Sequence, residues 1–68
     1  MMSWQAERFA SEHQAHLIAV MTSTGTFDGQ PAGVRFDRSQ RRLCLQLTES
    51  RWRTRSIPVD SIRRLRAL

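Results

Sequence analysis

Arginine is the residue type whose number and spacing in this chain most clearly suggest chemistry. The 68 residues contain eleven basic residues, all of them arginine, and carry a net charge of +5. Arg51, Arg53 and Arg55 alternate, and on a β-strand this spacing places all three on one face, about 6.5 to 7 Å apart. Such an interval is close to that between successive phosphates of a single nucleic-acid strand. Arginines arranged in this way neutralise a phosphate backbone and release its counterions without reading base sequence.

A second group of arginines precedes a predicted strand at 42–48. The expected nucleic-acid surface combines both groups with Phe27, which is expected at the tip of a turn where its ring can stack on a base. Trp52 lies among the arginines in sequence, but its side chain is expected on the opposite face of the strand. The abundance of arginine is equally compatible with a coding bias and with protection of an exposed sheet edge from aggregation. The predicted binding residues are Arg38, Arg41, Arg42, Arg51, Arg53, Arg55 and Phe27.

Catalytic and metal-binding groups are few. Cys44 is the only cysteine, and as a nucleophile it would need an electropositive, partly exposed setting near His13 or His16. Because Cys44 falls in the middle of a regular strand pattern, a structural role is expected. The two histidines have the i, i+3 spacing of a pair of metal ligands, but two ligands do not make a site. The sequence therefore predicts a protein with no catalytic residues, no metal and no cofactor.

The elements that must position these residues follow from one change in hydrophobic periodicity. The pattern is helical over residues 3–16, with an apolar face from which Trp4 points away. From Leu17 onward the chain is rich in short β-type patterns separated by turn residues. The expected strands are 17–22, 32–36, 42–48 and 51–57, with a last strand near the C-terminus and turns at 24–29 and 37–40.

The strand at 42–48 indicates where the core lies. Its alternation sends Leu43, Leu45 and Leu47 to a core face and Cys44 to the other face. Pro31 is expected only at the start of a strand, because it cannot donate a backbone hydrogen bond.

The segment after Pro58 is expected to make a short helical turn before the last strand. A C-terminal helix is the alternative, since Ile62 and Leu65 also fit helical spacing. Together these patterns predict one domain, 1–68, of the mainly β class. It consists of an N-terminal α-helix (3–16) followed by a small five-stranded barrel of the SH3-like or Sm-like type (17–68).

This order of elements resembles the Rof family of Rho-termination inhibitors and, more broadly, Sm-like barrels. The resemblance is carried by the helix that runs through His13 and His16 into Leu17, the turn at 28–29, the leucines of the strand 42–48, and the segment 55–62. It implies a protein that binds the Rho hexamer and blocks its access to RNA, with the helix and the adjoining barrel edge as the contact surface. Rof-like proteins are acidic, whereas this chain is basic, so charge favours nucleic acid over Rho as its partner.

The sequence therefore predicts a small regulatory binding module for RNA or single-stranded DNA. The alternative is a protein-interaction module of Rof or Sm-like type that docks on a transcription or RNA-processing machine, with Trp4 and Arg8 in the interface. The chain has no long apolar run, which argues against a secretory signal or a membrane span and for a cytoplasmic location. A homo-oligomer is expected, because so small a domain without an internal disulfide gains stability by association.

Overall fold

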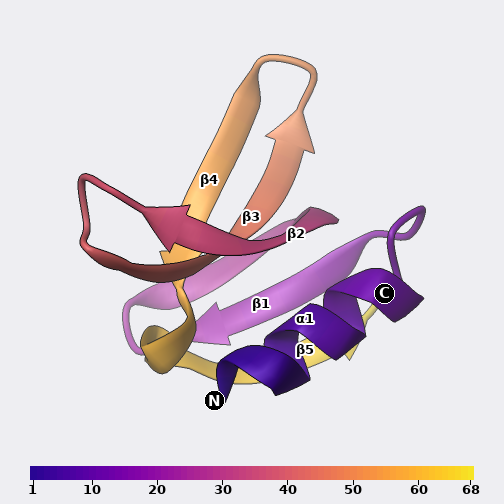
Figure 1. Ribbon diagram of the computed structural model, residues 1–68. Helices are drawn as coiled ribbons and strands as arrows, with labels where there is room; N and C mark the ends of the chain where they lie inside the picture. The colour runs from indigo at the N-terminus through magenta and orange to yellow at the C-terminus, as the bar shows by residue number, and fades with distance from the viewer.

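The computed structural model describes residues 1–68 as one helix followed by five strands (Figure 1). The mainly β class and the N-terminal helix are thus confirmed. A last strand follows a short 3-10 helix after Pro58, so the alternative of a C-terminal helix is wrong. In chain order the elements are α1 (Ser3–Glu12), β1 (Ile18–Thr22), β2 (Gly25–Asp37), β3 (Arg42–Ser50), β4 (Arg53–Pro58), the 3-10 helix η1 (Val59–Ser61) and β5 (Ile62–Ala67).

The strands form one antiparallel sheet in the order β4-β3-β2-β1-β5. Strand β2 is shared between two halves of this sheet, because its first part pairs with β1 and its second part pairs with β3. Between Pro31 and Val34 the register shifts, and Gly33 there has a φ of 107°, a conformation that suits glycine. The sheet bends at this point (Figure 1). It does not close, so β4 and β5 remain its outer strands.

The start of β2 differs from the sequence prediction, which placed a turn at 24–29 and a strand from residue 32. The turn is much tighter. The Thr22 hydroxyl donates to the Gly25 carbonyl (2.9 Å) and accepts from the Thr24 backbone N–H (3.2 Å). The chain therefore reverses at once, and Gly25 to Gly29 pair with β1. Pro31 lies buried within β2, next to the register shift, where a missing N–H is tolerated.

The helix ends at Glu12, four residues earlier than predicted. His13 has a non-helical backbone (φ −125°, ψ 26°), and its ring nitrogen Nδ1 lies 2.8 Å from the Phe9 carbonyl oxygen. Its ring also stacks on that of Phe9, with 4.0 Å between the centroids. In a continuing helix, the backbone N–H of His13 would donate to the Phe9 carbonyl. The side chain of His13 occupies that carbonyl instead. Helix α1 is also not long and apolar enough to cross a membrane.

The core lies on the face of the sheet that α1 covers, and α1 packs mainly against β2. Leu45 and Leu47 of β3 are completely buried there, as predicted, but Leu43 on the same face is 45% exposed. Cys44 on the opposite face is also completely buried, which differs from the predicted single core face. The buried cluster consists of Ala10, Ile18, Val20, Leu45, Leu47, Ile57 and Ile62.

Candidate nucleic-acid interface

The tip of the hairpin formed by β3 and β4 carries the most exposed aromatic ring of the molecule. Trp52 is 90% exposed and lies in the turn between the two strands. Its backbone N–H donates to the Ser50 hydroxyl at 3.4 Å, and its neighbours Arg51 and Arg53 are both exposed. Figure 1 shows this hairpin extending well away from α1 and β5. The tip thus presents one aromatic ring between two cations.

The arginines of this hairpin do not form the continuous row that the alternation predicted. Arg51 lies in the turn, and only Arg53 and Arg55 belong to β4. Arg55 is paired in register with Leu47, so it faces the core side of the sheet and is half-buried. Its Nε lies 3.1 Å from Oε1 of Glu49, and the two side chains form an ion pair. Both atoms are buried, and neither makes a hydrogen bond. The charge of Arg55 is therefore largely offset within the chain, whereas Arg51 and Arg53 face solvent.

Phe27 is in the middle of β1–β2 pairing rather than at a turn tip. It is paired with Val20 and packs against the core. The guanidinium carbon of Arg55 lies 4.2 Å from the centroid of its ring, an arrangement in which cation and ring attract each other. One face of Phe27 is thus taken by Arg55. The aromatic ring that is open to a ligand is instead that of Trp52, which was not among the predicted binding residues.

The exposure of Trp52 could have been predicted from the residues around it in the sequence. No apolar residue other than Trp52 occurs between Leu47 and Ile57, so this stretch has nothing else to bury. Two strands joined within such a stretch extend beyond the core, and the residue at their junction is exposed. The alternation of arginines hid this junction, because it resembles one uninterrupted strand.

The second group of predicted arginines lies at a different end of the sheet. Arg38 and Arg41 are exposed in the turn between β2 and β3, and Figure 1 shows that turn well apart from the tip of the β3–β4 hairpin. Arg42 follows at the start of β3 and forms an exposed ion pair with Asp60, with 3.4 Å between Nη1 and Oδ1. The structure therefore separates the two groups that the sequence prediction combined into one surface.

Asp37 holds the turn between β2 and β3 in shape. Its Oδ1 accepts hydrogen bonds from the Ser39 hydroxyl (2.6 Å), the Ser39 N–H (2.9 Å) and the Gln40 N–H (3.0 Å). The bond from the Ser39 hydroxyl is the main cause that lowers the pKa of this carboxyl below its usual value. The ionised carboxylate thus keeps the turn that carries Arg38 and Arg41.

A small pocket lies where β4 curls over the hairpin of β1 and β2. Strands β4 and β1 are not neighbours in the sheet, and the pocket lies in the seam where they approach each other. We therefore call it the seam pocket. It has a volume of about 180 Å³, and the first residue of β4 that lines it, Arg55, follows Trp52 by three residues. Hydroxyl groups are frequent in its lining, which consists of Thr22, Thr24, Phe27, Arg55, Ser56, Ile57, Pro58 and Ser61.

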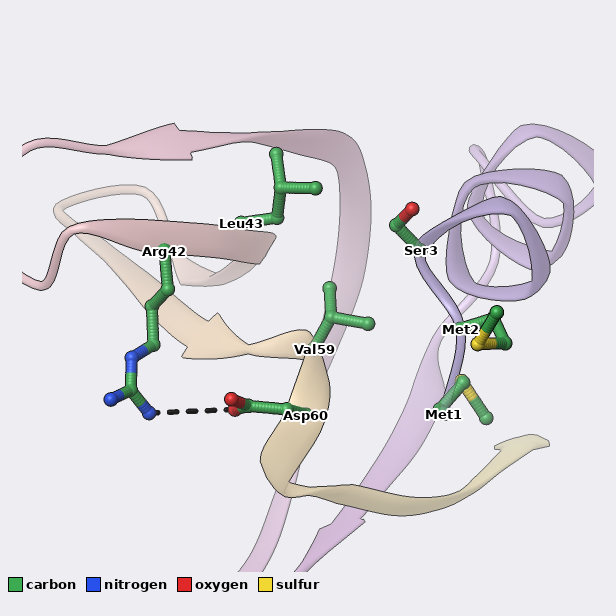
Figure 2. A pocket seen from close by; sticks show the side chains of 7 residues that line it. All are labelled: Met1, Met2, Ser3, Arg42, Leu43, Val59 and Asp60. Atoms are coloured by element: carbon green, nitrogen blue, oxygen red, sulfur yellow. Dashed lines mark hydrogen bonds and ion pairs between the residues drawn. The ribbon is translucent and has the colours of Figure 1, made fainter.

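A larger and more apolar cavity, of about 280 Å³, lies beside the start of α1. Figure 2 shows Met1, Met2, Leu43 and Val59 around it, with the ion pair of Arg42 and Asp60 at one side. The residues predicted for a protein interface lie on the helix that begins here. Trp4 is 57% exposed, and Arg8 is exposed and paired with Glu12 at 3.7 Å.

The remaining candidates for chemistry are not assembled into a site. His13 and His16 lie with their ring centroids 6.3 Å apart, but no group of three potential metal ligands occurs in the structure. Burial is the main cause that raises the pKa of the Cys44 thiol, which lowers its thiolate content and hence its reactivity. Cys44 therefore packs as a structural residue.

Comparison with known proteins gives no match to a family model, a curated protein or a solved structure. The resemblance to the Rof family accordingly stays a prediction. The function of the chain must therefore be inferred from its own side chains and their geometry.

Proposed function

We propose that this chain is a small binding protein for single-stranded nucleic acid and that the tip of its β3–β4 hairpin makes the main contact. The observation that carries the proposal is the exposed ring of Trp52 between Arg51 and Arg53. Stacking of a base on an aromatic side chain contributes about 1 to 3 kcal/mol, and each arginine can neutralise a phosphate. A single strand offers unstacked bases to such a ring, whereas a duplex keeps them inside.

We further infer that the curled sheet belongs to the SH3-like or Sm-like type of small barrel. The strand order β4-β3-β2-β1-β5 and the 3-10 helix between the last two strands support this assignment. In such a fold the sheet is a rigid base for its hairpins. Strand β4 begins at the tip of the β3–β4 hairpin and also lines the seam pocket, so one strand of nucleic acid can contact both.

Replacing Trp52 with alanine should weaken binding of single-stranded nucleic acid by about 1 to 3 kcal/mol, because one base no longer stacks on the protein. Trp4→Ala is the matched control, since Trp4 is also exposed but lies on α1, away from the proposed site. Fluorescence anisotropy of labelled RNA and DNA strands of about eight nucleotides measures both. Equal affinities for the two variants would refute the role of Trp52.

The same titration at two salt concentrations tests the arginines. A protein with Arg51→Gln and Arg53→Gln should bind more weakly. The slope of log K against log salt should become less steep by about 0.7 for each phosphate that is no longer neutralised. Arg55 is left in place, because its interactions with Glu49 and Phe27 belong to the fold. An unchanged slope in a folded double variant would exclude these arginines as phosphate ligands.

Protein binding is the second candidate function, favoured by the exposed Trp4 and by the apolar cavity beside the start of α1. The partner implied by the resemblance to Rof is the Rho hexamer. Titration of purified Rho would test this function, and there Trp4→Ala and Arg8→Ala should weaken binding while Trp52→Ala should not. Absence of binding to Rho would leave nucleic acid as the proposed partner.

Self-association is a further expectation, because β4 and β5 each leave one edge unpaired and unpaired edges readily pair with other chains. We expect a homo-oligomer at micromolar concentration, with a dimer as the commonest closed form. Multi-angle light scattering measures its mass. The mass of a single chain would contradict the prediction and leave both edges free for other partners.

A further inference from the structure

Three hydroxyl groups of the seam pocket, those of Thr22, Thr24 and Ser61, use their hydrogens in bonds within the chain and so have none to donate to a ligand. The Thr22 hydroxyl donates to the Gly25 carbonyl, so the bond between the Thr22 and Thr24 hydroxyls (3.2 Å) takes its hydrogen from Thr24. The Ser61 hydroxyl donates to the Pro58 carbonyl at 2.8 Å. Each hydroxyl has only one hydrogen, and those of Thr24 and Ser61 are thus used within the chain.

The lone pairs that remain define what these side chains can bind. Thr22 already accepts from the Thr24 N–H and the Thr24 hydroxyl, so it has no free position. Thr24 and Ser61 each donate one bond and accept none from the chain. They therefore suit a ligand that brings O–H or N–H groups. A phosphate at pH 7 brings acceptors and is not favoured beside them.

Arg55 supplies the complementary groups at the same pocket. Its ion pair with Glu49 uses Nε, which leaves its two terminal nitrogens as donors. The guanidinium carbon of Arg55 lies over the ring of Phe27, so a planar ligand would stack on the guanidinium from the side away from Phe27. Guanidinium planes do stack on bases in protein–RNA complexes. The lining of the pocket thus combines the guanidinium of Arg55, its terminal donors, and the hydroxyls of Thr24 and Ser61, which can only accept.

We propose that the seam pocket binds a ribonucleotide, with its base on the guanidinium of Arg55 and its 2′-hydroxyl donating to Thr24 or Ser61. This inference rests on the proposed function and deepens it, because it selects RNA over DNA. A 2′-hydroxyl is a donor that every ribonucleotide carries and every deoxyribonucleotide lacks. Trp52 lies in the turn just before β4, three residues from Arg55. Three residues span at most about 10 Å, so a nucleic-acid strand stacked on Trp52 reaches the pocket within about two nucleotides.

The test compares RNA with DNA of the same sequence, about eight nucleotides long, by fluorescence anisotropy. The unaltered protein should bind RNA roughly 2- to 10-fold more tightly, the effect of one hydrogen bond. In the variant Thr24→Val with Ser61→Ala this ratio should fall close to one, while the affinity for DNA stays the same. Thr26→Val is the matched control, because Thr26 is exposed on β2 outside the pocket.

Equal affinities of the unaltered protein for RNA and DNA would overturn the inference, and so would a ratio that the double variant leaves unchanged. In either case a decrease of both affinities in Trp52→Ala would still support the proposed function. If the protein binds neither strand, both the proposed function and this inference fail. An unchanged affinity for DNA shows that the double variant is folded. If the double variant does not fold, the single variants Thr24→Val and Ser61→Ala allow the same comparison of RNA with DNA.

Discussion

Replacing Leu45 with alanine should lower the free energy of unfolding by about 2 to 5 kcal/mol, a large part of what a small domain possesses. Leu45 is completely buried and lies in register between Val34 of β2 and Ile57 of β4. Truncation leaves a cavity that the two flanking strands cannot fill, because both are held by backbone hydrogen bonds. Urea unfolding followed by circular dichroism measures the decrease.

Leu43→Ala is the control for this prediction, because Leu43 is on the same face of β3 but 45% exposed. It should cost much less, since part of its surface already meets water. Cys44→Ser should also cost less than Leu45→Ala, because a serine hydroxyl can keep the hydrogen bond that the Cys44 thiol donates to the Arg42 carbonyl (3.6 Å). A decrease for Leu43→Ala as large as that for Leu45→Ala would show that the core extends over the whole face of β3.

Gly29→Ala should destabilise the protein by about 1 to 3 kcal/mol through overpacking. A Cβ at residue 29 would lie 2.6 Å from the Thr48 carbonyl oxygen and 2.9 Å from the Leu47 Cγ. The closest of these atoms belongs to the backbone of β3, so relief requires β2 and β3 to move apart where they are paired. The melting temperature should fall accordingly.

Gln30→Ala is the matched control for this substitution, since Gln30 is the next residue of β2 and its side chain is exposed. It should leave the melting temperature nearly unchanged. If Gly29→Ala melted at the same temperature as Gln30→Ala, the close approach of β2 and β3 at this residue would be wrong.

Much of the fold could be predicted because local pattern and tertiary environment agree. The alternating leucines of β3 and the short turn after Pro58 are examples. The start of β2 could not be predicted in this way. Its glycines and Asp28 are typical of turns, but their pairing with β1 outweighs that preference. Only the tight turn after Thr22 makes this pairing possible, and one threonine is a weak signal.

The region of the candidate site could be predicted from the sequence, but the arrangement of its side chains could not. Arginine alternation correctly marked the region of β4, yet the partner of each arginine depends on strand register. Arg55 lies opposite Leu47, pairs with Glu49 and is only partly exposed because β3 and β4 pair as they do. Likewise, no glycine, proline or asparagine marks the turn at Trp52, so the exposure of this ring follows only from the hairpin.

The pairing of β1 with β5 has a consequence for how the protein is made. Ile18 pairs with Ala67, and the Leu68 N–H donates to the Leu17 carbonyl at 3.0 Å. These interactions join residues far apart in the sequence, and such long-range pairing slows folding because a large loop must close first. During synthesis the N-terminal residues leave the ribosome first, so β1 has only β2 beside it until β5 emerges. The sheet is therefore completed only once β5 has left the ribosome, and one edge of β1 stays unpaired until then.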